Sequence, residues 1–78
     1  MMSPTIIQTK NLFFRIYPKD HKPKHVHIIG PDAEAKFNLE TMDFIESYGF
    51  SAKSLKIIKE VICDNLDTLL EAWDDYQK

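Results

Sequence analysis

The sequence predicts an α+β domain in which a three- or four-stranded antiparallel sheet is covered on one face by a C-terminal helical region. Three observations support this prediction. Apolar and polar residues alternate along short segments between residues 11 and 40. The turn signal Gly30-Pro31-Asp32 separates two of these segments. From residue 55 onward, apolar residues recur every three or four positions, which is typical of an amphipathic helix.

The length and composition limit the class of protein. A chain of 78 residues corresponds to a single domain, residues 1–78, with one modest core. The hydrophobic share of 44% argues against intrinsic disorder. The net charge of −2 gives no overall signal for nucleic acid or for an anionic membrane. No apolar run approaches the roughly 20 residues of a membrane span, and no signal peptide is recognised. We therefore expect a cytoplasmic protein without membrane contact.

Three segments are predicted as strands. Residues 11–17 form the first strand, which Pro18 ends, and residues 25–29 and 33–40 form an antiparallel hairpin. Alternation places one set of side chains on the face that the helical region must cover. This predicted inner face consists of Leu12, Phe14, Ile16, Val26, Ile28, Ala35, Phe37 and Leu39.

Two further segments each allow two predicted conformations. Residues 1–8, which contain Pro4, are expected either to fray or to pair as an edge strand. Residues 43–47 are expected to form either a short fourth strand or irregular chain.

The helical region is predicted over residues 51–76, with Ser51 as its N-cap. The unbroken phase of the apolar stripe favours one long helix. However, the lysines come early and the acids late, opposite to the preference of a single helix dipole. Two helices that meet near residues 64–65 remain the alternative. The stripe consists of Leu55, Ile58, Ile62, Leu66, Leu69 and Trp73.

Several side chains of this region have predicted roles. Cys63 is the only cysteine and lies in an apolar run, so we expect a buried structural thiol. We expect Trp73 and Tyr76 to close the core. The basic residues gather towards the front of the chain and the acidic residues at its end. This asymmetry would suit a homo-oligomer or a partner protein, and the alternative is that both charged regions are simply solvated faces.

All three histidines occur within seven positions, in the run Asp20-His21-Lys22-Pro23-Lys24-His25-Val26-His27. Because side chains alternate along a strand, His25 and His27 share the face opposite the predicted core. A turn centred on Pro31 and Asp32 would place His27 opposite Lys36 and His25 opposite Asn38. If the first strand pairs likewise, Arg15 approaches His27 and Tyr17 approaches His25.

The histidines allow three interpretations. In the first, His25 and His27 bind zinc or another divalent metal together with Asp20 or His21. In the second, the polar face binds phosphate or RNA, with the imidazoles as proton donors. In the third, the histidines are ordinary polar residues on a solvated sheet face. Arg15 and Lys36 favour an anion and oppose a metal. The candidate binding residues are Arg15, Tyr17, His21, His25, His27 and Lys36, and the candidate metal ligands are Asp20, His21, His25 and His27.

The chain resembles the small prokaryotic family catalogued as domain of unknown function 4160. The resemblance covers most of the chain and depends on a motif that family members typically read as Asp-His-x-Pro-Pro-His-x-His. Here Lys24 replaces the second proline, which makes the loop more basic. The other matching segments are Phe14-Arg15-Ile16-Tyr17, Glu34-Ala35-Lys36-Phe37-Asn38-Leu39-Glu40 and Leu69-Leu70-Glu71-Ala72-Trp73.

The resemblance implies a compact α+β domain in a prokaryotic cytoplasm. It also implies a toxin–antitoxin-like arrangement with a small partner protein. The first functional hypothesis is therefore an accessory protein of such a module, whose His/Arg/Lys sheet face binds phosphate, RNA or the partner. A divalent-metal-binding domain and a non-catalytic dimeric interaction module are the alternatives. The sequence assigns no reaction.

Overall fold

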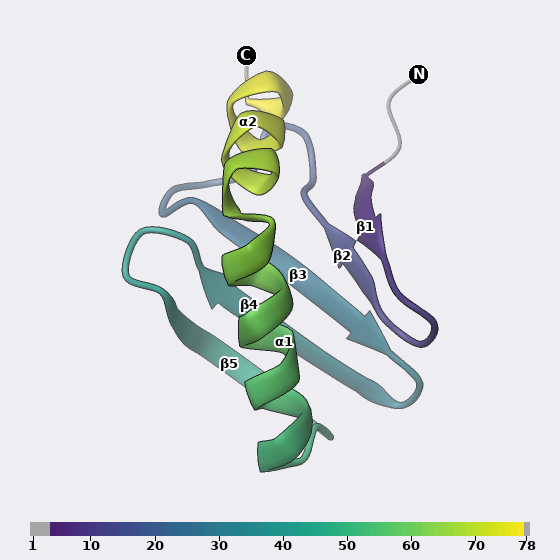
Figure 1. Cartoon of the computed structure of the whole chain (residues 1–78). Helices are drawn as coiled ribbons and strands as arrows, with labels where there is room; N and C mark the ends of the chain where they lie inside the picture. The colour runs from purple at the N-terminus through teal and green to yellow at the C-terminus, as the bar shows by residue number, and fades with distance from the viewer. Residues whose placement is uncertain (1–3, 78) are drawn as a thin grey trace.

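The computed structural model describes residues 4–77, which form a five-stranded antiparallel sheet followed by two helices (Figure 1). The strands lie in the order β1-β2-β3-β4-β5, so that each pairs with its neighbour in the sequence. The predicted α+β class is confirmed, although the sheet has more strands than expected. The elements are β1 (Thr5–Gln8), β2 (Phe13–Arg15), β3 (His25–Gly30), β4 (Ala33–Asn38), β5 (Asp43–Tyr48), α1 (Ala52–Asp64) and α2 (Leu66–Tyr76).

The two additional strands are the segments that the sequence left open. β1 pairs with β2, and residues 1–3 of the predicted leader lie outside the described residues. β5 pairs with β4. Their register shifts by one residue between two adjacent pairs: Lys36 lies opposite Glu46, but Phe37 lies opposite Phe44. Ile45 is the unmatched residue between them. Such a bulge interrupts alternation, which explains why this strand was not predicted with certainty.

The core lies between the sheet and the helices. The helices cross one face of the sheet and leave the other face uncovered (Figure 1). The predicted inner face is confirmed: Leu12 is partly buried, and the other seven side chains are buried. From the helices, the stripe supplies four buried side chains, and Leu55 and Leu66 pack against them. The four are Ile58, Ile62, Leu69 and Trp73.

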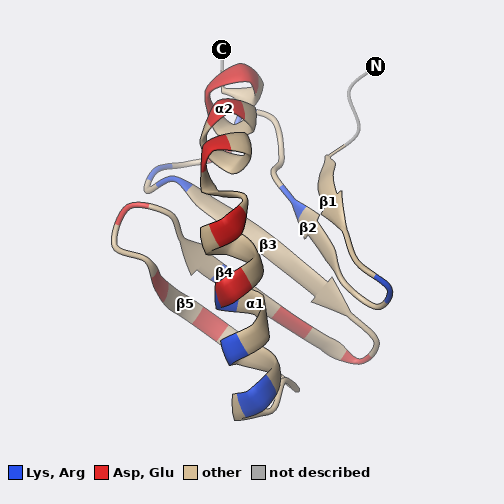
Figure 2. Cartoon of the chain, in the orientation of Figure 1, with Lys and Arg blue, Asp and Glu red and all other residues tan. Residues whose placement is uncertain are grey.

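The helical region consists of two helices rather than one. The hydroxyl of Ser51 accepts the N–H of Ser54 at 3.1 Å, which confirms the predicted N-cap. α1 ends at Asp64 and α2 begins at Leu66. Asn65 occupies the position between them, but its side chain donates to the carbonyl of Val61 and does not cap α2. Lysines mark the start of α1, and acids follow along its end and α2 (Figure 2).

Two expectations about helical side chains have opposite outcomes. Trp73 is 3% exposed and Tyr76 packs against the core, as predicted. The prediction for Cys63 is wrong, because its thiol is exposed. A helix turns by about 100° per residue, so the position after the buried Ile62 faces away from the core. Within residues 4–77, neither helix combines the length and apolar character needed to cross a bilayer.

Candidate metal centre

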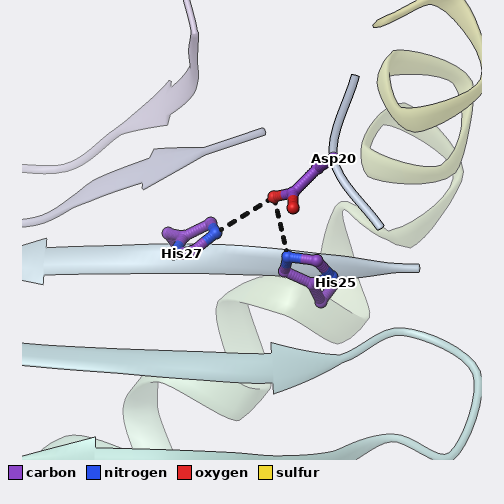
Figure 3. Close-up of side chains that lie close together, drawn as sticks. All are labelled: Asp20, His25 and His27. Atoms are coloured by element: carbon purple, nitrogen blue, oxygen red, sulfur yellow. Dashed lines mark hydrogen bonds and ion pairs between the residues drawn. The ribbon is translucent and has the colours of Figure 1, made fainter. Parts of the chain in front are cut away.

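Three side chains that can ligate a metal converge where β3 begins (Figure 3). Asp20 comes from the loop before β3, and His25 and His27 are the first and third residues of the strand. One ligand atom from each lies within 4.8 Å of the others. Oδ2 of Asp20 is 2.9 Å from Nε2 of His25 and 3.4 Å from Nε2 of His27. No other group of three His, Cys, Asp or Glu side chains comes together in this way between residues 4 and 77.

The strand register explains why both imidazoles belong to the cluster. Residues two apart on a strand share a face, and the ring centroids of His25 and His27 are 5.1 Å apart. Val26, between them, points into the core. The predicted neighbours are confirmed, since His27 lies opposite Arg15 on one side and Lys36 on the other.

His25 is more deeply buried than predicted. We expected both imidazoles on an open sheet face, but His25 is only 5% exposed, whereas the side chain of His27 is 23% exposed. The indole of Trp73 on α2 lies 5.1 Å from the His25 ring, centroid to centroid. The end of α2 therefore covers the start of β3, a tertiary contact that strand alternation cannot predict.

Hydrogen bonds determine which nitrogen of His25 faces the cluster. The carbonyl oxygen of Pro23 can only accept, so Nδ1 of His25, 2.7 Å away, donates its proton to it. Nε2 therefore faces Asp20. Nε2 lies 2.9 Å from Oδ2 of that carboxylate. If a metal binds, the same Nε2 would be the ligand, and the bond from Nδ1 to a carbonyl is the usual support of a ligating histidine.

The electrostatics keep the other two ligands in the form that binds a metal. Burial raises the pKa of the Asp20 carboxyl group, but the amide of His21, the charge of His25 and hydrogen bonds from both imidazoles outweigh it. The pKa of Asp20 therefore lies below its ordinary value of 3.8. Burial lowers the pKa of His27 below 6.5, and the charges of His25 and Lys36 add to this, against the opposing effect of Asp20. A carboxylate and a neutral imidazole result, as metal binding requires.

The distances from the Asp20 oxygen to the two imidazole nitrogens suit a small divalent ion. Zinc binds nitrogen and oxygen ligands at about 2.0–2.2 Å, so two ligand atoms of a tetrahedral ion lie about 3.3 Å apart. The separations of 2.9 and 3.4 Å from the Asp20 oxygen are close to this value. Two imidazoles and a carboxylate are donors that zinc and other transition metals accept. Three protein ligands leave one tetrahedral position for water.

Two residues of the predicted set lie differently from expectation. His21 is exposed, and its backbone amide donates to Oδ1 of Asp20 at 2.8 Å. Its side chain does not belong to the cluster, so Asp20 is the third candidate ligand in place of His21. Tyr17 was predicted to approach His25 through strand pairing, but β2 ends at Arg15. The Tyr17 ring packs edge-on against His27 instead, with centroids 4.8 Å apart.

The cations that flank His27 in the sheet are engaged by other groups. Nε of Arg15 donates to the hydroxyl of Thr5 at 3.2 Å, and the guanidinium lies 5.3 Å from the centroid of the Phe13 ring. Nζ of Lys36 lies 3.9 Å from a carboxylate oxygen of Glu46. Of the two positive charges that oppose a metal here, that of Lys36 is partly offset by Glu46, and Arg15 keeps its charge.

The last turn of α2 supplies contacts that sequence reasoning missed. The side chain of Gln77 bonds to the backbone of Tyr17 and of Asp20. Lys24, the residue that departs from the expected motif, lies 3.5 Å from Asp74. No local pattern predicts these contacts, because they join segments far apart in the chain.

The fold and the cluster define a small α+β domain with a candidate His–His–Asp metal centre. Over residues 11–74, the chain matches the family described as domain of unknown function DUF4160, and it belongs to that family. The resemblance seen in the sequence is thereby confirmed. Asp20, His25 and His27 lie inside the matched segment, and Gln77 lies outside it. No curated protein and no solved structure matches the chain.

Proposed function

We propose that this protein binds a divalent transition metal, with zinc as the first candidate, through Asp20, His25 and His27. The observation that carries the proposal is the convergence of three ligand atoms within 4.8 Å of one another. The bond from His25 to the Pro23 carbonyl supports it, because it leaves Nε2 of His25 facing the two other ligands.

The geometry favours a metal over an anion at this position. Oδ2 of Asp20 lies within hydrogen-bonding distance of both Nε2 atoms, where a phosphate oxygen would have to bind. A phosphate would have to displace this carboxylate or accept its repulsion. A cation gains from the same carboxylate. Asp20 therefore supports the metal over the phosphate, two interpretations that the histidines alone leave open.

The proposal is tested by the metal content of protein produced without an affinity tag, loaded with zinc and then dialysed. We expect about one zinc per chain in the wild type and a small fraction of that in the His25→Ala/His27→Ala variant. His21→Ala is the matched control, because it removes an exposed imidazole from the same motif, and it should keep its zinc. Zinc at background level in the folded wild-type protein would refute the proposal.

The role within a toxin–antitoxin-like module, with a small partner protein, RNA or a second copy as ligand, stays a prediction, as does the cytoplasmic location. The open face that carries Arg15, His27 and Lys36 is where such a ligand would bind. RNA binding or cleavage that persists unchanged in the His25→Ala/His27→Ala variant would remove the histidines from that role.

A further inference from the structure

We propose that the side-chain carboxamide of Gln77 positions Asp20 beside the two histidines and thereby sets the affinity of the site for its metal. The proposal rests on metal binding by Asp20, His25 and His27. It assigns a positioning role to the C-cap residue of α2, which lies beyond residues 11–74, the segment that matches the family.

Gln77 contacts the loop before β3 with both ends of its carboxamide. Its Oε1 accepts the backbone N–H of Asp20 at 2.6 Å, and its Nε2 donates to the carbonyl of Tyr17 at 2.8 Å. The backbone N–H of Lys19 adds a bond to the carbonyl of Tyr76 at 3.3 Å. Three hydrogen bonds therefore tie the end of α2 to the chain between residues 17 and 20.

The backbone of this loop needs such support. Lys19 has a φ of 57°, in the left-handed region that residues other than glycine seldom adopt. A conformation of this kind persists where the surroundings hold it in place. Because Asp20 follows Lys19 directly, release of the Gln77 contacts would let the loop relax and move the carboxylate away from the imidazoles.

A ligand atom binds its metal more weakly when it is displaced by a fraction of a bond length. Changes in the residues that orient metal ligands typically cost about 10–100-fold in affinity. The coupling is reciprocal, since a metal held by Asp20 also holds the loop and strengthens its contacts with the end of α2. Occupancy of the site and docking of the last helical turn are therefore linked.

The first measurement is the zinc affinity of the Gln77→Ala variant, obtained by competition with a chromophoric chelator. We expect about tenfold weaker binding than in the wild type. Gln77→Glu keeps an acceptor for the Asp20 amide and loses the donor to Tyr17, so it should fall in between. Asp74→Asn is the matched control, because it removes the Lys24–Asp74 contact of the same helical end. It should bind within about twofold of the wild type, since exposed pairs contribute little.

The second measurement needs no metal and separates this inference from the proposed function. In the metal-free protein, the ring resonances of His25 and His27 should shift in Gln77→Ala and stay unchanged in Asp74→Asn. A wild type that binds no zinc while these rings shift in Gln77→Ala would refute the metal site and leave the positioning role in place. Ring resonances that do not shift in Gln77→Ala would overturn the role of Gln77. Wild-type zinc affinity in Gln77→Ala would also overturn it, if the double histidine variant binds no zinc.

Discussion

The indole ring of Trp73 lies 5.1 Å from the imidazole of His25, centroid to centroid. Both residues are almost fully buried, at 3% and 5% exposure. This contact joins the candidate metal site to the core and to α2. His25 therefore has a structural role in addition to its proposed role as a ligand, and its substitution should affect stability and metal binding separately.

We expect His25→Ala to lower the free energy of unfolding of the metal-free protein by about 2 kcal/mol, because it removes a buried side chain together with its hydrogen bonds to the Pro23 carbonyl and the Asp20 carboxylate. The half-buried His27 makes one long contact with Asp20, at 3.4 Å, so His27→Ala should cost less than about 1 kcal/mol. Urea unfolding at neutral pH measures both values. Equal losses for the two variants would show that burial of His25 does not contribute as described.

The stability of the metal-free protein should fall on acidification. The folded-state pKa of His27 lies below 6.5, so the unfolded chain binds a proton first as the pH drops below that value. The free energy of unfolding then decreases until the pH reaches the folded-state pKa. The Asp20 carboxylate also makes the free energy of unfolding fall on acidification, but at lower pH. Its contribution is present above pH 3.8 and is lost as the pH falls through its folded-state pKa.

Urea midpoints across this pH range measure the effect. His27→Gln should abolish the decline that begins near pH 6.5 and keep the one at lower pH. A wild type whose stability rises between neutral pH and pH 6 would contradict the direction of the His27 shift.

Gly49 should be intolerant of a side chain. Its φ is +80°, and an added Cβ would lie 2.5 Å from the carbonyl oxygen of Asp32. We expect Gly49→Ala to lower the free energy of unfolding by about 2 kcal/mol, since left-handed strain alone costs of order 1–3 kcal/mol. Thermal unfolding measures the loss.

Gly30→Ala is the comparison for this position. A Cβ at Gly30 would meet the side chains of Leu12 and Phe50 at 3.1 Å, and side chains can move where backbone cannot. The loss should therefore be smaller. A larger loss for Gly30→Ala than for Gly49→Ala would show that backbone conformation at Gly49 is not the limiting factor.

The pairing of the central strands could be predicted because alternation with a period of two ties each side chain to one face. This reasoning placed His27 opposite Arg15 and Lys36, as observed. It left β5 uncertain because the bulge at Ile45 breaks the period. It misplaced Cys63, which follows Ile62 directly and therefore lies outside the stripe that faces the core.

The candidate site was predictable only in part. The pairing of His25 with His27 follows from their spacing, but the choice between Asp20 and His21 does not, because the loop conformation decides it. The contacts of Trp73 and Gln77 depend on where α2 ends against the sheet. Tertiary packing alone creates them, so no local pattern in the sequence could indicate them.

The most direct test of the metal site is a spectrum of the histidine ring nitrogens, recorded while zinc is added to the wild-type protein. Our account predicts that the Nε2 resonances of His25 and His27 shift until about one equivalent has been added, and that His21 does not respond. A titration in which neither of the two rings shifts, or in which His21 shifts together with His27, would contradict the account.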